Sequence, residues 1–283
     1  MLISRLITYF KTASEVIVVD SLERLLEGNE LEGWSEFKDK WFVKFFQKIL
    51  SSDTFRSRFI LTSQDFPSQI QSLGSRYQKR WYSLTLSGLT ENSQMKLFEK
   101  VGLNLESTEA RNYVIRIGKA YEGHPLALKT IAGEISVSPF FGNITAYWNT
   151  YGKEIKEVEK TIAEVKSGKA SSKDDKWEID RFTRTLYLNV RYRLTQTFDR
   201  LKTDCKWAYI LLCEASTYRS PVPEEWWLQH LEDWDVSEND QKNAINTLRD
   251  RLLLEEEISN EQCMVRLHNL IRSVALEHLR TLK

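Results

Sequence analysis

The sequence of 283 residues is poor in cysteine, has no long apolar segment and carries no net charge. Its three cysteines, Cys205, Cys213 and Cys263, are odd in number and lack paired spacing, so they exclude a disulfide framework and favour a reducing compartment. A metal site built from cysteine and histidine is also excluded, because Cys263 and His268 together supply at most two ligands. The 40 basic and 40 acidic residues cancel, which argues against a general binder of polyanions.

Segments that would attach the chain to a membrane are also missing. No apolar run approaches the ~20 residues that a spanning helix needs. The opening residues, MLISRLITYFK, are interrupted by Arg5 and Lys11 and are too short for a signal peptide. We therefore expect a cytoplasmic protein without membrane contact, and its length predicts two or three domains.

Residues 1–86 show the pattern of an α/β domain. Residues 16–19 form the continuous apolar run that is typical of a strand buried on both faces. Residues 58–62 and the alternating WYSLTL at 81–86 predict two further strands, and Pro67 is well placed to open a helix between them. Apolar residues at a spacing of four predict an amphipathic helix after the first strand: Phe37, Trp41, Phe45 and Ile49.

After this region the pattern becomes helical. A helix capped by Thr90, a second closed by Gly123 and a third opened by Pro125 predict a helical subdomain over residues 87–151. Residues 152–185 are charged and contain Gly and Ser, which predicts a linker.

Residues 186–283 predict a winged-helix subdomain. A helix over about residues 194–215 is followed by one opened by Pro223 and one capped by Ser237. LLLEEE and CMVRL flank the turn-forming ISNEQ and predict a hairpin, and a last helix follows. The expected fold is therefore mostly α: a partial nucleotide-binding α/β sheet, a helical bundle and a winged helix.

Polar residues follow the first two predicted strands. Asp20 ends the first, with Glu23 just beyond it, and Thr62, Ser63 and Gln64 end the second. Ligands of open α/β sheets bind at this edge, where nucleoside triphosphatases hold magnesium with an acid. The same residues also suit helix caps at the surface, so both interpretations stay open.

Two further motifs lie in the helical part. GHPLAL ends one helix and begins the next at Pro125, and RLHNLIRSVA places His268 where the second hairpin strand becomes the last helix. Each is explained by ordinary helix punctuation. Each would also bring a ring, of proline or of imidazole, close to a bound ligand.

In this order the four motifs resemble the STAND class of nucleotide switches, and specifically the NB-ARC/AP-ATPase family of bacterial type. The Walker B segment is matched by DSLERLL, the sensor strand by ILTSQ, and the start of the first helical subdomain by LSGLTENSQMKLF. The GxP motif is matched by GHPLAL and the MHD motif by LHN. The resemblance extends over residues 14–283.

This resemblance implies a switch that ADP holds closed and that ATP, bound with Mg²⁺, opens for assembly. By position, Asp20 would hold magnesium through water, with Glu23 beside it as a catalytic acid. Pro125 would pack on adenine, and His268 would contact the β-phosphate of ADP. The polar residues of the sensor strand would lie near the γ-phosphate: Thr62, Ser63 and Gln64.

The chain also departs from the family. It has no GxxxxGK[ST]; KSGKASS at 166–172 has Ala163 at the position of the first glycine and Ala170 after the lysine. Gln64 stands where many relatives have arginine, and Asn269 replaces the aspartate of the MHD motif. We therefore expect the C-terminal portion of such a switch, without ATP hydrolysis of its own. Another polypeptide would supply the P-loop, unless the chain is a degenerate relic, and the strand at 81–86 would lack a neighbour.

Two alternatives come from other classes. The chain is a nucleotide-free scaffold for a protein partner, or a homo-oligomer, if an exposed sheet edge within residues 14–86 serves as an interface. A winged-helix DNA binder is disfavoured, because a recognition helix over 238–251 mixes basic residues with acidic ones. Acidic residues also outnumber basic ones over 195–283.

Overall fold

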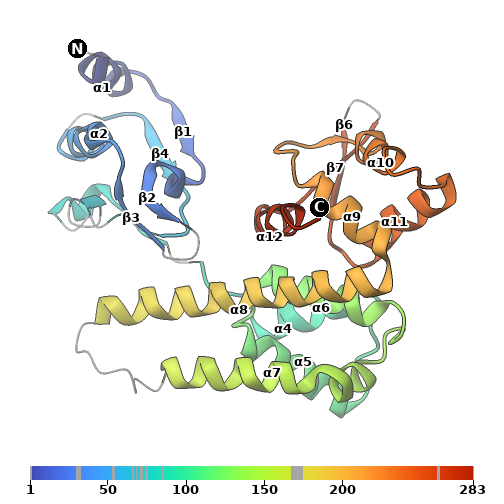
Figure 1. Cartoon of the computed structure of the whole chain (residues 1–283). Coiled ribbons are helices and arrows are strands. Elements are labelled where there is room, and N and C mark those ends of the chain that lie inside the picture. The colour runs from blue at the N-terminus through green and yellow to red at the C-terminus, as the bar shows by residue number, and fades with distance from the viewer. Residues whose placement is uncertain are drawn as a thin grey trace. The chain divides into compact units, whose positions relative to one another are not determined.

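The computed structural model describes residues 2–29, 33–52, 55–65, 67, 69–70, 73, 76–84, 86–166, 175–259 and 262–282. The chain is mostly helical, with small sheets, as predicted. It divides into two compact units, Met1–Leu86 and Ser87–Lys283, called here the first and second units (Figure 1). Among the described residues, no helix has the length and apolar character that crossing a membrane requires.

The first unit combines short strands with α-helices. β1 and β4 pair in parallel, with Val16 opposite Arg58 and Val19 opposite Leu61. β2 and β3 form a separate antiparallel hairpin. The elements are α1 (Leu2–Thr12), β1 (Val16–Val19), the 3-10 helix η1 (Leu22–Leu25), β2 (Leu26–Asn29), β3 (Gly33–Phe37), α2 (Lys40–Leu50), β4 (Arg58–Leu61) and the 3-10 helix η2 (Gln78–Arg80).

The amphipathic helix begins later than the four-residue spacing predicts. Asp39 caps α2 by accepting a hydrogen bond from Trp41 N at 2.8 Å, so Phe37 lies in β3 instead. Trp41 is exposed, and the buried face of α2 carries Phe46 and Ile49. Two of the four residues with this spacing do not belong to the buried face of the helix: Phe37 lies in a strand and Trp41 lies on the surface. The prediction was therefore wrong at the N-terminal end of the helix.

The third predicted strand is also wrong. Residues 81–84 and 86 are assigned to no strand, and Tyr82, Leu84 and Leu86 are exposed. An alternating pattern forms a strand only when another strand offers it hydrogen bonds, and neither sheet of the first unit does so in the described structure. The helix predicted to open at Pro67 lies largely outside the described residues.

The second unit is built from helices and one small sheet. α6 is buried along most of its length and packs against α4 and α8. The elements are α4 (Glu91–Lys100), α5 (Thr108–Ala120), α6 (Pro125–Ser136), α7 (Ile144–Lys166), α8 (Asp175–Asp204), α9 (Lys206–Ala215), β5 (Val222–Pro223), α10 (Glu224–Glu232), α11 (Glu238–Asp250), β6 (Glu255–Ser259), β7 (Gln262–Arg266) and α12 (Asn269–Leu279).

Several predicted helix boundaries in this unit are confirmed. The Thr90 hydroxyl accepts a hydrogen bond from Ser93 N, and the Ser237 hydroxyl accepts one from Asp240 N. Pro125 occupies the first turn of α6, where its missing N–H costs nothing. Gly123, with φ of +70°, ends the preceding turn. Local chemistry therefore decides where these helices begin and end.

Two predictions about long segments need correction. The helix expected over about 194–215 is two helices, because the chain breaks at Cys205 between α8 and α9. Residues 152–166 and 175–185 of the expected linker belong to α7 and α8, while the rest of it lies outside the described residues. Most charged side chains of residues 152–164 are exposed, as on the outer side of a long helix.

A buried ion network joins α6, α7 and α8. Glu134 on α6 is buried and pairs with Arg193 and with Arg200 Nη1, the latter at 2.7 Å. Arg200 Nη2 also lies 2.5 Å from Glu154 on α7, and Thr197 Oγ1 donates to Glu134 at 2.6 Å. Burial acts to raise the pKa of Glu134, but the two guanidinium groups lower it overall. Glu134 is therefore an ionised centre of this packing.

The C-terminal part of the second unit surrounds α9. The predicted hairpin is confirmed as β6 and β7, with Glu256 opposite Val265, and β5 adds a third strand beside β7. A Cβ at Gly133 of α6 would clash with the backbone carbonyl of Arg251. Glycine thus lets α6 pack directly on the end of α11, which holds the helices before α8 against those after it.

Candidate functional site

The predicted residues of the first unit meet at the ends of β1 and β4. Asp20 follows β1, Thr62 follows β4, and the Thr62 hydroxyl donates to Asp20 Oδ1 at 2.5 Å. The same hydroxyl accepts a hydrogen bond from Ser21 N at 3.0 Å. Both Asp20 and Thr62 remain exposed. The carboxylate is therefore held in place with its second oxygen available to a cation.

The backbone after Asp20 is held in an unusual conformation. Ser21 has φ of 58° and ψ of 53°, the left-handed region that residues other than glycine seldom adopt. The Ser21 side chain makes no cap bond to η1, so Asp20 and Ser21 do not form the surface helix cap that the alternative interpretation required. The turn instead directs the chain so that Leu22 N donates to Thr62 O at 2.8 Å.

The other predicted residues of this unit lie around the same edge. Glu23 is buried, and its Oε2 accepts from Gln64 N at 3.3 Å. Ser63 is exposed and donates through its hydroxyl to Asp65 O at 2.5 Å. Glu23 thus braces the segment after β4, whereas Asp20 faces solvent.

The GxP corner of the second unit is a close crossing of two backbones. Leu89 N donates to Gly123 O at 2.8 Å. A Cβ at Gly88 would clash with the backbone of residues 122–123, and a Cβ at Gly123 would clash with the backbone of Leu89. The crossing holds His124 at the N-cap of α6, where the imidazole makes no cap bond. Pro125 follows and is exposed. The corner therefore presents a proline ring to solvent beside a half-buried histidine.

His268 stands at the N-cap of α12. Its Nδ1 accepts a hydrogen bond from Leu270 N at 3.2 Å, so the neutral imidazole carries its proton on Nε2. Partial desolvation lowers the pKa of His268, although the residue as a whole is exposed. Glu255 opposes this shift, and Lys129 and Arg266 add to it. At neutral pH the ring is an uncharged donor with Nε2–H free of the cap bond.

The two histidines are close enough to sense each other. Burial, and then the charge of His268, lower the pKa of His124, and its Nδ1 is buried without a hydrogen-bond partner. The N-cap positions of α6 and α12 are therefore occupied by two histidines that lie within electrostatic reach of each other. Neither helix has an acidic residue in its first turn. Such a corner favours an anion, because N-terminal N–H groups and helix dipoles present partial positive charge.

The sequence motifs thus gather into two groups, one in each unit. Asp20, Thr62 and Glu23 share the edge of the parallel sheet, and Pro125 with His268 mark the corner of the second unit. Sequence reasoning missed His124 and Lys129. Both lie in or beside GHPLALK, and their position on the first turns of a helix opened by proline was the available signal.

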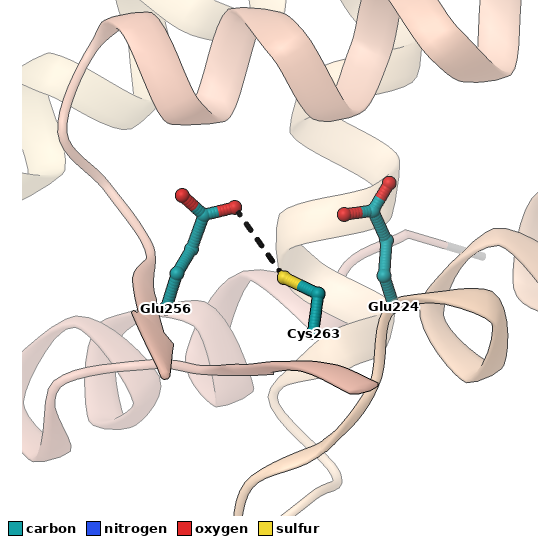
Figure 2. Close-up of side chains that lie close together, drawn as sticks. All are labelled: Glu224, Glu256 and Cys263. Carbon is teal, nitrogen blue, oxygen red and sulfur yellow. Dashed lines mark hydrogen bonds between the residues drawn. The ribbon is translucent and has the colours of Figure 1, made fainter. Parts of the chain in front are cut away.

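A further cluster joins Glu224, Glu256 and Cys263, whose ligand atoms all lie within 4.8 Å of one another (Figure 2). Arg249 already bridges the two carboxylates, with Nη2 2.6 Å from Glu224 and Nε 2.7 Å from Glu256. Slight burial and then the two carboxylates raise the pKa of the Cys263 thiol, which leaves it protonated at neutral pH. The cluster is an ion-pair clamp between α10, α11 and the hairpin, and we assign it no metal.

Comparison with protein-family models gives no match, and comparison with curated proteins gives none either. The geometry of the two groups is accordingly the basis for any functional assignment.

Proposed function

We propose that the chain is part of a nucleotide-dependent switch of the STAND class, of the NB-ARC type, whose second unit binds the phosphates of ADP. The observation that carries the proposal is that His124 and His268, at the N-cap positions of α6 and α12, lie within electrostatic reach of each other. A phosphate there would accept from His268 Nε2–H and would lie in the field of Lys129 and Arg266. Pro125, exposed beside it, offers an apolar ring for the base.

The finer architecture of the second unit supports this proposal. We assign α9 to α12, with the sheet β5–β7–β6, to a winged-helix subdomain, and α4 to α6 to a helical subdomain. Gly133 and Arg251 join the two directly. A phosphate contacted by residues of both α6 and α12 would hold the two subdomains together, and its loss would free them. This is the closed state that ADP is proposed to stabilise.

The first unit supplies the carboxylate that such a switch needs for magnesium. Asp20 is exposed, fixed by Thr62, and suited to hold Mg²⁺ through water. The chain has no phosphate-cradling loop, so we propose that a protein partner supplies it and that the chain alone does not hydrolyse ATP.

A nucleotide-free scaffold is the second candidate. The observation in its favour is the exposed apolar surface of the first unit, which includes Val16, Val18 and Ile60. The structure gives a further argument against the interpretation as a DNA-binding protein. On α11 and at its end, Lys242 pairs with Glu238, Arg249 with two glutamates, and Arg251 with Asp204 at 2.7 Å. These basic side chains are engaged with acids of the chain itself.

Calorimetric titration of the whole chain with ADP and with ATP tests the proposal. We expect micromolar binding of ADP that His268→Ala weakens at least about tenfold, the equivalent of about 1.4 kcal/mol. His268→Asn keeps an N-cap acceptor and should weaken binding as much, because the lost group is the Nε2–H donor.

The matched control is His278→Gln on the same helix, whose ring contacts Tyr209 at 3.1 Å, away from the cap of α12. It should leave ADP binding unchanged. No heat with either nucleotide would contradict the proposal and favour the scaffold. Binding that His268→Asn does not change would limit His268 to capping.

A further inference from the structure

Helices α1 and α2 of the first unit carry basic residues and no acidic ones. They contain Arg5, Lys11, Lys40, Lys44 and Lys48, whereas the chain as a whole has equal numbers of the two charges. Within the described structure, no carboxylate forms an ion pair with any of these five side chains. The exposed residues of the two helices, called here the α1–α2 surface, are therefore positively charged.

The acids that adjoin the two helices in the chain do not neutralise this charge by pairing with it. Asp39 caps α2 by accepting from Trp41 N at 2.8 Å, and Glu15 accepts from the Tyr9 hydroxyl at 3.3 Å. The lysines of α2 recur every four residues, so about 6 Å of helix separates each from the next. The result is a row of ammonium groups open to an anionic partner.

Large apolar side chains are mixed with the basic ones on the same surface. Leu2, Arg5 and Tyr9 are spaced by three and four residues and share one side of α1, where Leu2 is 74% and Tyr9 54% exposed. On α2, Trp41 is 59% exposed, and Lys44 Nζ lies 4.7 Å from the centre of its ring. The surface thus offers apolar contact as well as charge.

α1 and α2 pack against each other (Figure 1) and leave a shallow groove of about 400 Å³ between them. Ile3 and Ser4 of α1 line this groove, together with Trp41, Lys44 and Lys48 of α2. Two ammonium groups and a hydroxyl suit a phosphate, and the indole and isoleucine suit an apolar group attached to it. A phospholipid headgroup combines these two properties.

The mixture of side chains favours a lipid surface over other polyanions. An anionic leaflet attracts clustered lysine and arginine, and its headgroup layer accommodates tryptophan, tyrosine and leucine. A single-stranded nucleic acid would use the lysines and could stack on Trp41, but it offers little to an exposed leucine. Charge and apolar contact together therefore indicate one partner.

We propose that the α1–α2 surface binds the headgroup layer of an anionic membrane and places a phospholipid phosphate in the groove. Contact of this kind requires no spanning helix. It replaces the expectation of no membrane contact, which rested on the lack of a long apolar run. The inference concerns the first unit alone and does not depend on nucleotide binding by the second.

Co-sedimentation of the whole chain with vesicles tests the proposal. Vesicles of phosphatidylcholine alone are compared with vesicles in which one third of the lipid is phosphatidylserine. We expect at least about tenfold tighter binding to the anionic vesicles at physiological salt. Most of this binding should be lost at about 1 M salt, where the Debye length falls to about 3 Å.

Two variants locate the contact. Lys40→Gln with Lys44→Gln and Lys48→Gln should weaken binding at least about 30-fold, because each lysine near an anionic leaflet contributes several-fold. Trp41→Ser should weaken it about fivefold through the lost apolar contact. All four side chains are exposed, so the helical circular dichroism should stay unchanged.

Matched controls lie in the second unit. Lys153→Gln with Lys156→Gln and Lys160→Gln removes the same net charge from exposed lysines of α7. Trp226→Ser removes a tryptophan that is 48% exposed. Both variants should bind anionic vesicles as the unchanged chain does.

Four outcomes would overturn the proposal. The first is no binding to anionic vesicles, and the second is equal binding to neutral ones. The third is an equal loss in the α7 variant, which would make general basic charge responsible. The fourth is tighter binding to a single-stranded RNA of about 16 nucleotides that the triple change on α2 abolishes, because the surface would then serve a nucleic acid.

Discussion

The two units differ in how far they cover their own apolar surfaces. The second unit buries α6 among its neighbours and places a paired ion network at the same centre. The first unit covers one face of its parallel sheet and leaves the other in solvent. Both contain strongly apolar segments, so composition does not separate them. The difference teaches that the second unit encloses its central helix, whereas the described part of the first unit leaves one face of its parallel sheet uncovered.

This difference also bears on stability. An apolar side chain stabilises the folded state only where folding removes it from water, by about 25 cal/mol for each Å². Val16, Val18 and Ile60 contribute little in this way, whereas residues of α6 such as Leu128 and Ile131 contribute fully. We therefore expect the second unit to resist denaturants more strongly than the first.

The largest expected effect would break the completeness of the second unit. Glu134→Gln removes the buried carboxylate that Arg193 and Arg200 share and leaves Glu154 as their remaining partner. Removing one partner of a buried pair costs about 3–5 kcal/mol, and we expect that loss in the free energy of unfolding by urea. Glu164→Gln is the control, because Glu164 pairs with Lys160 on the exposed side of α7 and should cost less than about 0.5 kcal/mol. Equal losses in the two variants would contradict the role assigned to the network.

A pair of changes on neighbouring residues sharpens the comparison within the first unit. Val19→Asn places an amide in the packed face and should destabilise the unit by about 2 kcal/mol. Val18→Asn, on the solvent-exposed face of β1 and β4, should lower the free energy of unfolding by less than about 1 kcal/mol, which is the full range of strand preferences. Amide exchange of β4 measures both. Similar losses of stability for Val18→Asn and Val19→Asn would mean that the exposed face of β1 and β4 is covered in solution.

The smallest expected effect is a pH dependence of the second unit. Burial lowers the pKa of His124, His268 and His278 below the ordinary value of about 6.5. As pH falls below 6.5 the unfolded chain binds protons that the folded chain does not, so the free energy of unfolding decreases. One proton bound only by the unfolded chain would give a slope of at most about 1.4 kcal/mol per pH unit. None of the three residues is fully buried, and His268 is exposed, so screening by water makes the total smaller than full burial would give.

Urea unfolding at pH 7.5 and pH 5.5 measures this slope. His124→Gln with His268→Asn should reduce the loss of stability between the two values. Glu134 does not contribute in this window. Its pKa lies below its ordinary value, so its stabilising effect is lost only as pH falls through that lower value. If the double variant loses as much stability between pH 7.5 and pH 5.5 as the unchanged chain, the lowered pKa of the two imidazoles is contradicted.

Sequence reasoning located most elements of the second unit, because its signals are local. Thr90 and Ser237 accept hydrogen bonds from the backbone N–H groups three residues ahead, and Pro125 fits only a first helical turn. The same reasoning failed at WYSLTL and at the hairpin β2–β3. Strand pairing depends on the hydrogen bonds that a second strand offers, whether it is near or far in sequence, so alternation alone does not decide it.

The candidate site was predicted unevenly for the same reason. Asp20, Thr62, Pro125 and His268 were all found from short motifs. Their order along the chain does not say that the Thr62 hydroxyl would bind Asp20. Nor does it say that His124 would lie within electrostatic reach of His268, which is far from it in the sequence of the second unit.

The sequence by itself determined that this chain is mostly helical, where its helices are capped and which residues are candidates for binding. These properties follow from hydrogen bonds and side-chain preferences within a few residues. Only the tertiary structure decided that the histidines at the starts of α6 and α12 lie within electrostatic reach of each other and that one face of β1 and β4 stays in solvent. Both result from contacts, made or missing, between segments far apart in the chain, and local preferences carry no information about these.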